Sequence, residues 1–152
     1  PYVLGALAAA NQAGLLTAGI TCNPGSPLAE VAQFAMVPIV GPEFVTGSTR
    51  MKSGTAQKLV LNMISTISMV RLGKTFGNLM VDLQISNEKL QDRAVRIIEK
   101  ATGASKQEST DALKASGHEV KVAILMLLLN IEPAAARERL QASSNRIREA
   151  LK

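Results

Sequence analysis

Aromatic side chains are scarce in this sequence of 152 residues: they make up 3% of it, with three Phe, one Tyr and no Trp. A core without aromatic rings has to be built from Leu, Ile, Val, Met and Ala, which favours packed helices. The same scarcity argues against the nucleic-acid-binding modules that stack bases on exposed rings. Hydrophobic residues nevertheless make up 47% of the chain, so the sequence predicts a globular protein rather than a disordered one.

Residues that form disulfides or bind metals are also few, since Cys22 is the only cysteine and His118 the only histidine. No disulfide can form within the chain, and a zinc site built from these two residues would lack ligands. A lone free cysteine suits a reducing, cytoplasmic compartment. We expect Cys22 to be a buried, unreactive thiol and His118 to be a capping or surface residue.

Long apolar runs are missing as well. The longest, Val122 to Leu129, is far too short to cross a bilayer, so no membrane segment is expected. The first residues carry neither an initiator Met nor a basic region, so they do not resemble a signal peptide, and we expect the chain to begin within a domain.

The chain carries a formal net charge of +5, from 17 Lys and Arg against 12 Asp and Glu. This charge suits an anionic partner, either a nucleic acid or a phosphorylated metabolite. The basic residues are interspersed with acidic ones, which is typical of solvated helix faces rather than of a stripe that follows phosphates. We therefore expect no nucleic-acid partner.

The first part of the chain has the pattern of an α/β protein. Apolar runs at Leu15–Cys22 and Phe34–Val40, each bounded by turn residues, predict two buried parallel strands. Helices are predicted at Tyr2–Ala13 and Leu28–Val31, so the order of elements is that of the tail of a doubly wound unit. Two strands cannot complete such a sheet. We expect further strands upstream in a longer protein, and the alternative is that a second copy of the chain supplies them.

From Gly54 onward the pattern is helical. A long helix is predicted over Thr55–Lys74, because apolar residues recur there every three or four positions and Gly73 stands near its end. Further helices are predicted over 87–101, from the Ser105/Glu108 capping box towards Gly117, over 119–129, from Pro133 onward and over 144–151. The sequence thus predicts an α/β domain over 1–86 and a helical module over 87–152.

A polar, glycine-rich loop joins the second predicted strand to the long helix. Ligands of open α/β sheets lie beyond the carboxyl ends of the strands. The start of a helix adds unpaired N–H groups and a positive dipole end, which suit a phosphate or a sugar oxygen. The turn after the first strand should lie at the same edge of the sheet. The residues predicted to bind ligand are Asn23, Glu43, Thr46, Gly47, Ser48, Thr49, Arg50, Lys52 and Ser53.

An ordinary connector is the alternative for this loop. In that case Ser53 or Thr55 caps the helix, the charges face water, and Glu43 balances Arg50. A nucleotide-binding P-loop is rejected, because Met51 stands where the motif needs a glycine before its lysine.

Several segments resemble the N-acetylmuramic acid 6-phosphate etherases. The main one is Gly41-Pro42-Glu43 followed by the run from Thr46 to Lys58, and the others lie at 21–24, 61–66, 78–82 and 134–138. The glucokinase regulatory protein shares a looser version of the run. The resemblance covers essentially the whole chain and places it in the carboxy-terminal half of that family. It implies the tail of a sugar isomerase (SIS) fold, followed by a three-helix module similar to ubiquitin-associated (UBA) domains. The apolar Val122–Leu129 stretch lies within this module, and we expect it to pack against the SIS domain.

The family's reaction, as implied by this resemblance, cleaves the D-lactyl ether of N-acetylmuramic acid 6-phosphate and yields N-acetylglucosamine 6-phosphate and D-lactate. It needs neither metal nor organic cofactor, and it belongs to cytoplasmic recycling of cell-wall amino sugars by homodimers. The family's two acid/base glutamates lie in the other half, so no catalytic residue is expected in this chain, which should be inactive alone. The alternative is a regulatory protein that binds a sugar phosphate without catalysis.

Overall fold

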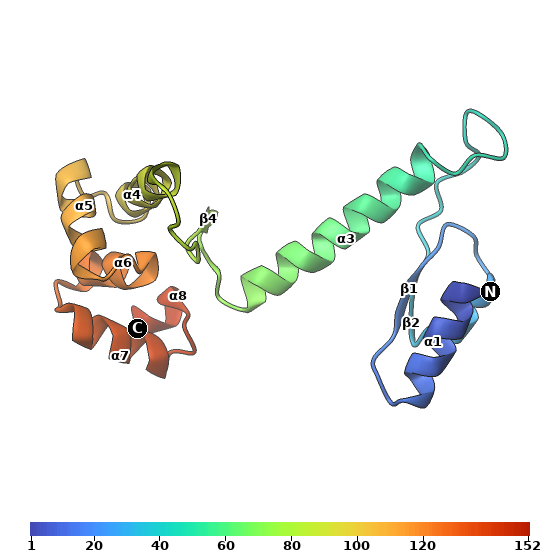
Figure 1. Ribbon diagram of the computed structural model, residues 1–152, viewed down its shortest axis with the longest axis horizontal. Helices are drawn as coiled ribbons and strands as arrows, with labels where there is room; N and C mark the ends of the chain where they lie inside the picture. Colours follow the sequence, from blue (N-terminus) through green and yellow to red (C-terminus); the bar gives the residue numbers. More distant parts are fainter. The chain divides into compact units, whose positions relative to one another are not determined.

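The computed structural model describes residues 1–152, which group into two compact units, Pro1–Ser65 and Thr66–Lys152 (Figure 1). The predicted α/β class is confirmed, because helices dominate and two small sheets accompany them. The division into domains 1–86 and 87–152 stays a prediction. None of the helices is long and apolar enough to cross a membrane.

The first unit holds a parallel pair of strands between helices. Its elements are α1 (Tyr2–Gln12), β1 (Ala18–Ile20), α2 (Pro27–Val31) and β2 (Phe34–Met36), with Ala18 opposite Phe34 and Ile20 opposite Met36. Both strands are shorter than predicted, because each has only one neighbour and Pro38 has no N–H to extend the ladder. Helix α2 packs closely on β1 at Gly19, where an added Cβ would lie 2.6 Å from Leu28 Cδ2.

A buried hydroxyl ties these elements together. The Thr17 side chain, 4% exposed, donates to Asn11 Oδ1 at 2.6 Å and accepts from the backbone N–H of Gln33 at 3.2 Å. The Asn11 amide in turn donates to the carbonyl of Val31 at 2.8 Å. The end of α1, the start of β1 and the α2–β2 connection are thereby fixed around one threonine.

The long helix α3 spans Lys52–Arg71, so it begins three residues earlier than predicted. It ends at Arg71, three residues before the predicted Lys74, where Gly73 has φ +72° and the N–H of Lys74 donates to the carbonyl of Met69 at 3.0 Å. This is the left-handed termination that glycine favours. Of all its side chains only Ser53 is buried.

After the end of α3, the second unit contains a short hairpin that the sequence patterns did not predict, formed by β3 (Thr75–Phe76) and β4 (Leu79–Met80). Its helices are α4 (Glu88–Thr102), α5 (Lys106–Ala115), α6 (Val120–Leu129), α7 (Pro133–Ala142) and α8 (Ile147–Ala150). The predicted helices are confirmed within a few residues. Asn87 and the Ser105/Glu108 capping box begin α4 and α5, and Gly103 at φ +78° ends α4.

The core of the second unit is assembled around α6. Residues 120 to 125 of this helix are all buried, and they pack in one cluster with α4, α5, α7 and α8. Val81, which follows the hairpin, is 1% exposed in the same cluster. The apolar run was expected to pack against the SIS domain. The buried residues of its first turns pack within the helical unit itself, and packing of the run against the SIS domain stays a prediction.

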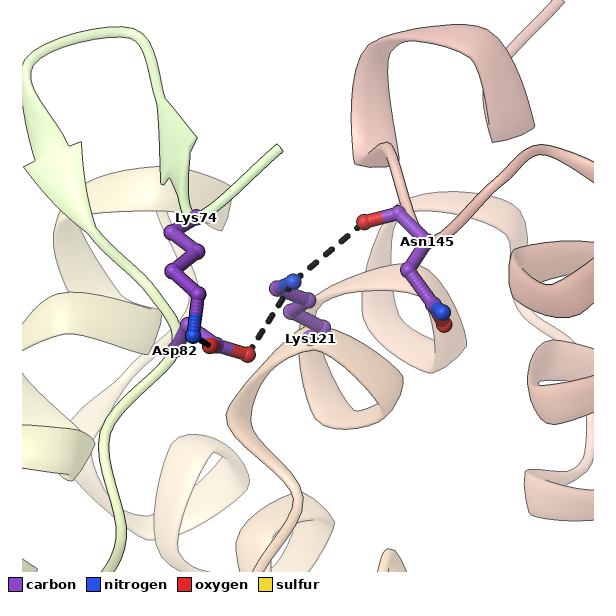
Figure 2. Close-up of polar contacts among 4 residues, drawn as sticks. All are labelled: Lys74, Asp82, Lys121 and Asn145. Atoms are coloured by element: carbon purple, nitrogen blue, oxygen red, sulfur yellow. Dashed lines mark hydrogen bonds and ion pairs between the residues drawn. The ribbon is translucent and has the colours of Figure 1, made fainter. Parts of the chain in front are cut away.

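A lysine is buried beside this core. Lys121, 9% exposed, lies 3.1 Å from the Asp82 carboxylate and donates to the carbonyl of Asn145 at 3.3 Å (Figure 2). Lys74 binds the other carboxylate oxygen of Asp82 at 2.6 Å. The segment after β4, helix α6 and the α7–α8 connection are thus joined by one charged cluster.

Candidate functional site

Two loops of the first unit meet at a small cavity beyond the ends of β1 and β2. One is the turn after β1, which carries Asn23, and the other runs from Val40 to the start of α3. The cavity measures about 250 Å³ and is lined by Cys22, Asn23, Val40, Gly41, Pro42, Glu43, Thr46, Gly47, Ser48, Thr49 and Ser53. As expected, both turns lie at the same edge of the sheet.

Most of the residues predicted to bind ligand lie on this cavity, but Arg50 and Lys52 do not line it. Sequence reasoning missed Val40, Gly41 and Pro42 as lining residues, although Gly41 and Pro42 stand in the recognised motif and Val40 directly precedes it. It was wrong about the burial of Cys22, which is half-buried and lies on the cavity wall. The position of Cys22 directly before Asn23, at the carboxyl end of β1, was the signal that could have indicated this.

Glu43 holds the first turn of α3. Its carboxylate accepts hydrogen bonds from the backbone N–H of Lys52 at 3.0 Å and from that of Ser53 at 3.1 Å. Capping of this helix by Ser53 or Thr55, which belonged to the alternative interpretation of the loop as an ordinary connector, is therefore wrong. The reason is that a carboxylate satisfies two orphan N–H groups at once and also interacts favourably with the positive end of the helix dipole.

These contacts also set the ionisation of Glu43. The hydrogen bonds from the backbone of Lys52, and then of Ser53, lower the pKa of its carboxyl below the usual value. A carboxylate that is kept ionised in this way is a poor general acid. The side chain is therefore better suited to holding structure or accepting hydrogen bonds than to proton transfer.

A second contact closes the base of the loop. The Lys52 ammonium donates to the carbonyl of Pro42 at 2.9 Å. Glu43 and Lys52 therefore cross-link the two ends of the segment. We call residues 42, 43, 52 and 53 the neck, and residues 44–51 the lobe.

The lobe contains no helix or strand, and it presents several hydroxyl groups. Gly47 at φ +87° allows a turn in which the N–H of Ser48 donates to the carbonyl of Val45 at 3.3 Å. Thr46 and Thr49 are exposed and Ser48 is half-buried. Together with the Asn23 amide they offer neutral donors and acceptors on the cavity wall. Such a wall can bind the hydroxyl and phosphate oxygens of a sugar phosphate.

No group of three or more His, Cys, Asp or Glu side chains is placed to hold a metal ion. The cavity lining contains two ionisable side chains, those of Cys22 and Glu43.

Known proteins match this chain closely. A family model described as the C-terminal lid domain of glucokinase regulatory protein matches residues 77–123. The chain is 58% identical to the N-acetylmuramic acid 6-phosphate etherase of Enterobacter sp. strain 638 over 99% of its own length and 51% of that relative. It is 60% identical to the protein of the same name from Pectobacterium atrosepticum, over 99% of this chain and 50% of the relative.

A third relative of this name comes from Rubrobacter xylanophilus and is 59% identical over 96% of this chain and 48% of the relative. The chain thus spans about half the length of the curated relatives that it matches. The resemblance predicted from the loop residues is confirmed: over nearly all of its residues the chain is similar to half of an N-acetylmuramic acid 6-phosphate etherase.

Proposed function

We propose that this chain forms the carboxy-terminal half of an etherase, a carbon–oxygen lyase that acts on N-acetylmuramic acid 6-phosphate. The reaction consumes one water and releases D-lactate and N-acetylglucosamine 6-phosphate, by elimination followed by addition of water. The single observation that carries the proposal is the high identity, 58% over 99% of the chain, to a relative with that name. The hydroxyl-lined cavity at the strand ends supports it, because that is where α/β sheets bind ligands.

In this proposal the chain binds substrate rather than breaking the ether bond. Asn23, Thr46, Gly47, Ser48, Thr49 and Ser53 face the sugar phosphate, and Arg50 supplies a positive charge from the lobe. Because the Glu43 carboxylate is held by two N–H groups, the acid and base would come from the other half of the protein. The chain alone is therefore expected to release no D-lactate.

The size of the cavity supports a shared site. At about 250 Å³ it falls below the roughly 300–1,000 Å³ typical of small-molecule sites. A phosphorylated amino sugar needs further walls. We propose that the missing walls, like the missing strands of the sheet, belong to the half that the relatives have in addition. The first unit would then be the tail of an SIS domain.

A regulatory protein is the second candidate. The match of residues 77–123 to the C-terminal lid domain of glucokinase regulatory protein favours it. In that case the complete protein binds a sugar phosphate and performs no chemistry. The two candidates differ in the other half of the protein, where only the etherase needs two acidic residues facing the cavity.

The deciding experiment is a chimaera in which this chain replaces the matching half of the Pectobacterium etherase. We expect the chimaera to release D-lactate from N-acetylmuramic acid 6-phosphate, measured with D-lactate dehydrogenase. This chain by itself, without the other half, is the negative control, and the unaltered Pectobacterium protein is the positive one. A folded chimaera that binds N-acetylglucosamine 6-phosphate without releasing D-lactate would instead support the regulatory candidate.

Further features of the proposal rest on the sequence patterns and on the resemblance. We propose that the complete protein is a cytoplasmic homodimer, that its domain boundary lies at 86/87, and that α4, α5 and α6 form a UBA-like module. Light scattering of the chimaera would test whether it is a homodimer.

A further inference from the structure

In the neck of the loop, backbone N–H groups at the start of α3 that could bind a phosphate already donate to a side chain. Helix N-termini bind anions through their unpaired N–H groups. In this protein two N–H groups of the first turn of α3, those of Lys52 and Ser53, already donate to Glu43 at 3.0 and 3.1 Å. A phosphate could use them only by displacing a carboxylate of the same sign of charge.

Lys52 is committed in a comparable way. Its ammonium donates to Pro42 at 2.9 Å and does not line the cavity. Glu43 and Lys52 thus join the two ends of the loop reciprocally. The side chain of Glu43 binds the backbone at 52 and 53, and the side chain of Lys52 binds the backbone at 42. A loop of this length with closed ends loses much of its conformational freedom before any ligand arrives.

We propose that Glu43 and Lys52 are positioning residues that hold the lobe, and that a sugar phosphate binds to the hydroxyl wall of Asn23, Thr46, Ser48 and Thr49 while Glu43 remains on α3. This inference rests on the proposed function and sharpens it, because it removes two charged residues from the predicted ligand contacts. The lowered pKa of the Glu43 carboxyl agrees with it, since a carboxylate bound to two N–H groups stays ionised.

The first test follows backbone amide resonances of the full chain while pH is lowered. We expect the amide protons of Lys52 and Ser53 to shift together, with a midpoint below the ordinary glutamate value of about 4.3. Glu43→Gln should abolish this shift. Glu30→Gln, at an exposed glutamate of α2, is the matched control and should leave it unchanged. If the amide resonances of residues 52 and 53 do not titrate in the unaltered chain, Glu43 does not accept hydrogen bonds from them, and the proposed positioning role of Glu43 is contradicted.

Lys52 is tested through the motion of the lobe. We expect Lys52→Met to lower the heteronuclear NOE of residues 44–49, because one of the contacts that close the loop is lost. Lys58→Met changes an exposed lysine further along α3 and should have no such effect. An unchanged NOE in Lys52→Met would overturn the bracing role of this lysine.

The last test adds N-acetylglucosamine 6-phosphate, the proposed product, at millimolar concentration to the chimaera, which supplies the remaining walls of the proposed site. We expect shifts at Asn23, Thr46, Ser48 and Thr49, while Lys52 and Ser53 continue to titrate with Glu43. Loss of that titration in the presence of ligand would mean that the phosphate displaces Glu43, which overturns the inference. Titration at the neck without ligand-induced shifts at these four residues of the chimaera would overturn the ligand placement. Release of D-lactate by the same chimaera would then show that the proposed function itself still stands.

Discussion

Ser109 carries a hydroxyl group into the core of the helical unit without a hydrogen-bond partner. The residue is fully buried, at 0% exposure, on α5. A buried polar group without a partner costs roughly 1–3 kcal/mol of desolvation. We therefore expect Ser109→Ala to raise the free energy of unfolding of this unit by about 1 kcal/mol, with a small further gain from the helix propensity of alanine.

A matched control stands at the end of the same helix. Ser116 is equally buried, but its hydroxyl donates to the carbonyl of Leu113 at 2.8 Å. Ser116→Ala should therefore lower stability by about 1 kcal/mol. Hydrogen exchange of the α6 amides would measure both changes, because these core amides exchange through opening of the unit. If both variants are destabilised alike, the Ser109 hydroxyl has a partner after all.

At the same scale, the residues around the loop show what sequence can and cannot predict. The hydroxyls of Thr46, Ser48 and Thr49 were found because they follow an apolar run and precede a helix, which are local patterns. The role of Glu43 was missed because its partners lie nine and ten positions further along the chain. No rule of helix capping reaches that far, so the only caps that the sequence offered, in the alternative interpretation of the loop, were the nearer Ser53 and Thr55.

At the scale of elements, the charged cluster around Lys121 joins three parts of the helical unit. Asp82 binds Lys74 and Lys121, and hydrogen bonding to Lys74 is the main cause that lowers the pKa of its carboxyl, with Lys121 contributing further. Loss of this carboxylate would leave the nearly buried Lys121 with only the carbonyl of Asn145. The Asp82 side chain is 35% exposed, so water screens the pair. We expect Asp82→Asn to cost about 1–2 kcal/mol, less than the roughly 3–5 kcal/mol of a fully buried pair.

The same variant makes a prediction about pH. Because the pKa of Asp82 is lower in the folded state, its contribution is present above the unfolded value of about 3.9 and is lost as pH falls through the folded value. The stability difference between the unaltered chain and Asp82→Asn should therefore be constant near neutral pH and shrink below about pH 4. Urea denaturation followed by circular dichroism would measure it. Glu149→Gln, at the exposed pair with Lys152, is the control and should leave stability at neutral pH unchanged.

The elements also differ in how well sequence predicted them. The helices of the second unit followed from Asn87, Ser105, Gly103 and Pro133, since caps and first-turn prolines act within a few residues. The hairpin at 75–80 was missed because strands of two residues are too short to show alternation. The dipeptide Gly77-Asn78 was its available signal. The strands β1 and β2 were predicted too long, because apolar runs do not reveal how many neighbours a strand has.

At the scale of the whole molecule, the first unit leaves much apolar surface uncovered. Leu16 is 79% exposed and Ile39 is 77% exposed. Val3, Leu7, Ile20 and Leu28 line a hollow with Leu61 of α3. Parallel sheets are ordinarily covered on both faces and contain more strands than two. In the proposed function, this is the surface that the unit would bury against the other half of the protein.

We therefore expect the chain to associate with the half of the Enterobacter relative that it does not match. Co-expression followed by size-exclusion chromatography with light scattering should give a one-to-one complex, with less fluorescence from the apolar dye ANS than the separate chain. Leu61→Lys should weaken the complex. Leu128→Lys, at an exposed leucine of the helical unit, should not. Halves that remain separate at micromolar concentrations would contradict this prediction.

The position of Cys22 has a practical consequence. Because it is the sole thiol of the chain and lies half-buried on the cavity wall, a maleimide or a fluorinated alkylating reagent would attach beside Asn23 and nowhere else. The rate of labelling then reports directly whether a small molecule occupies the cavity. The natural thiol of Cys22 thereby reports the binding of a small molecule, without any engineered residue.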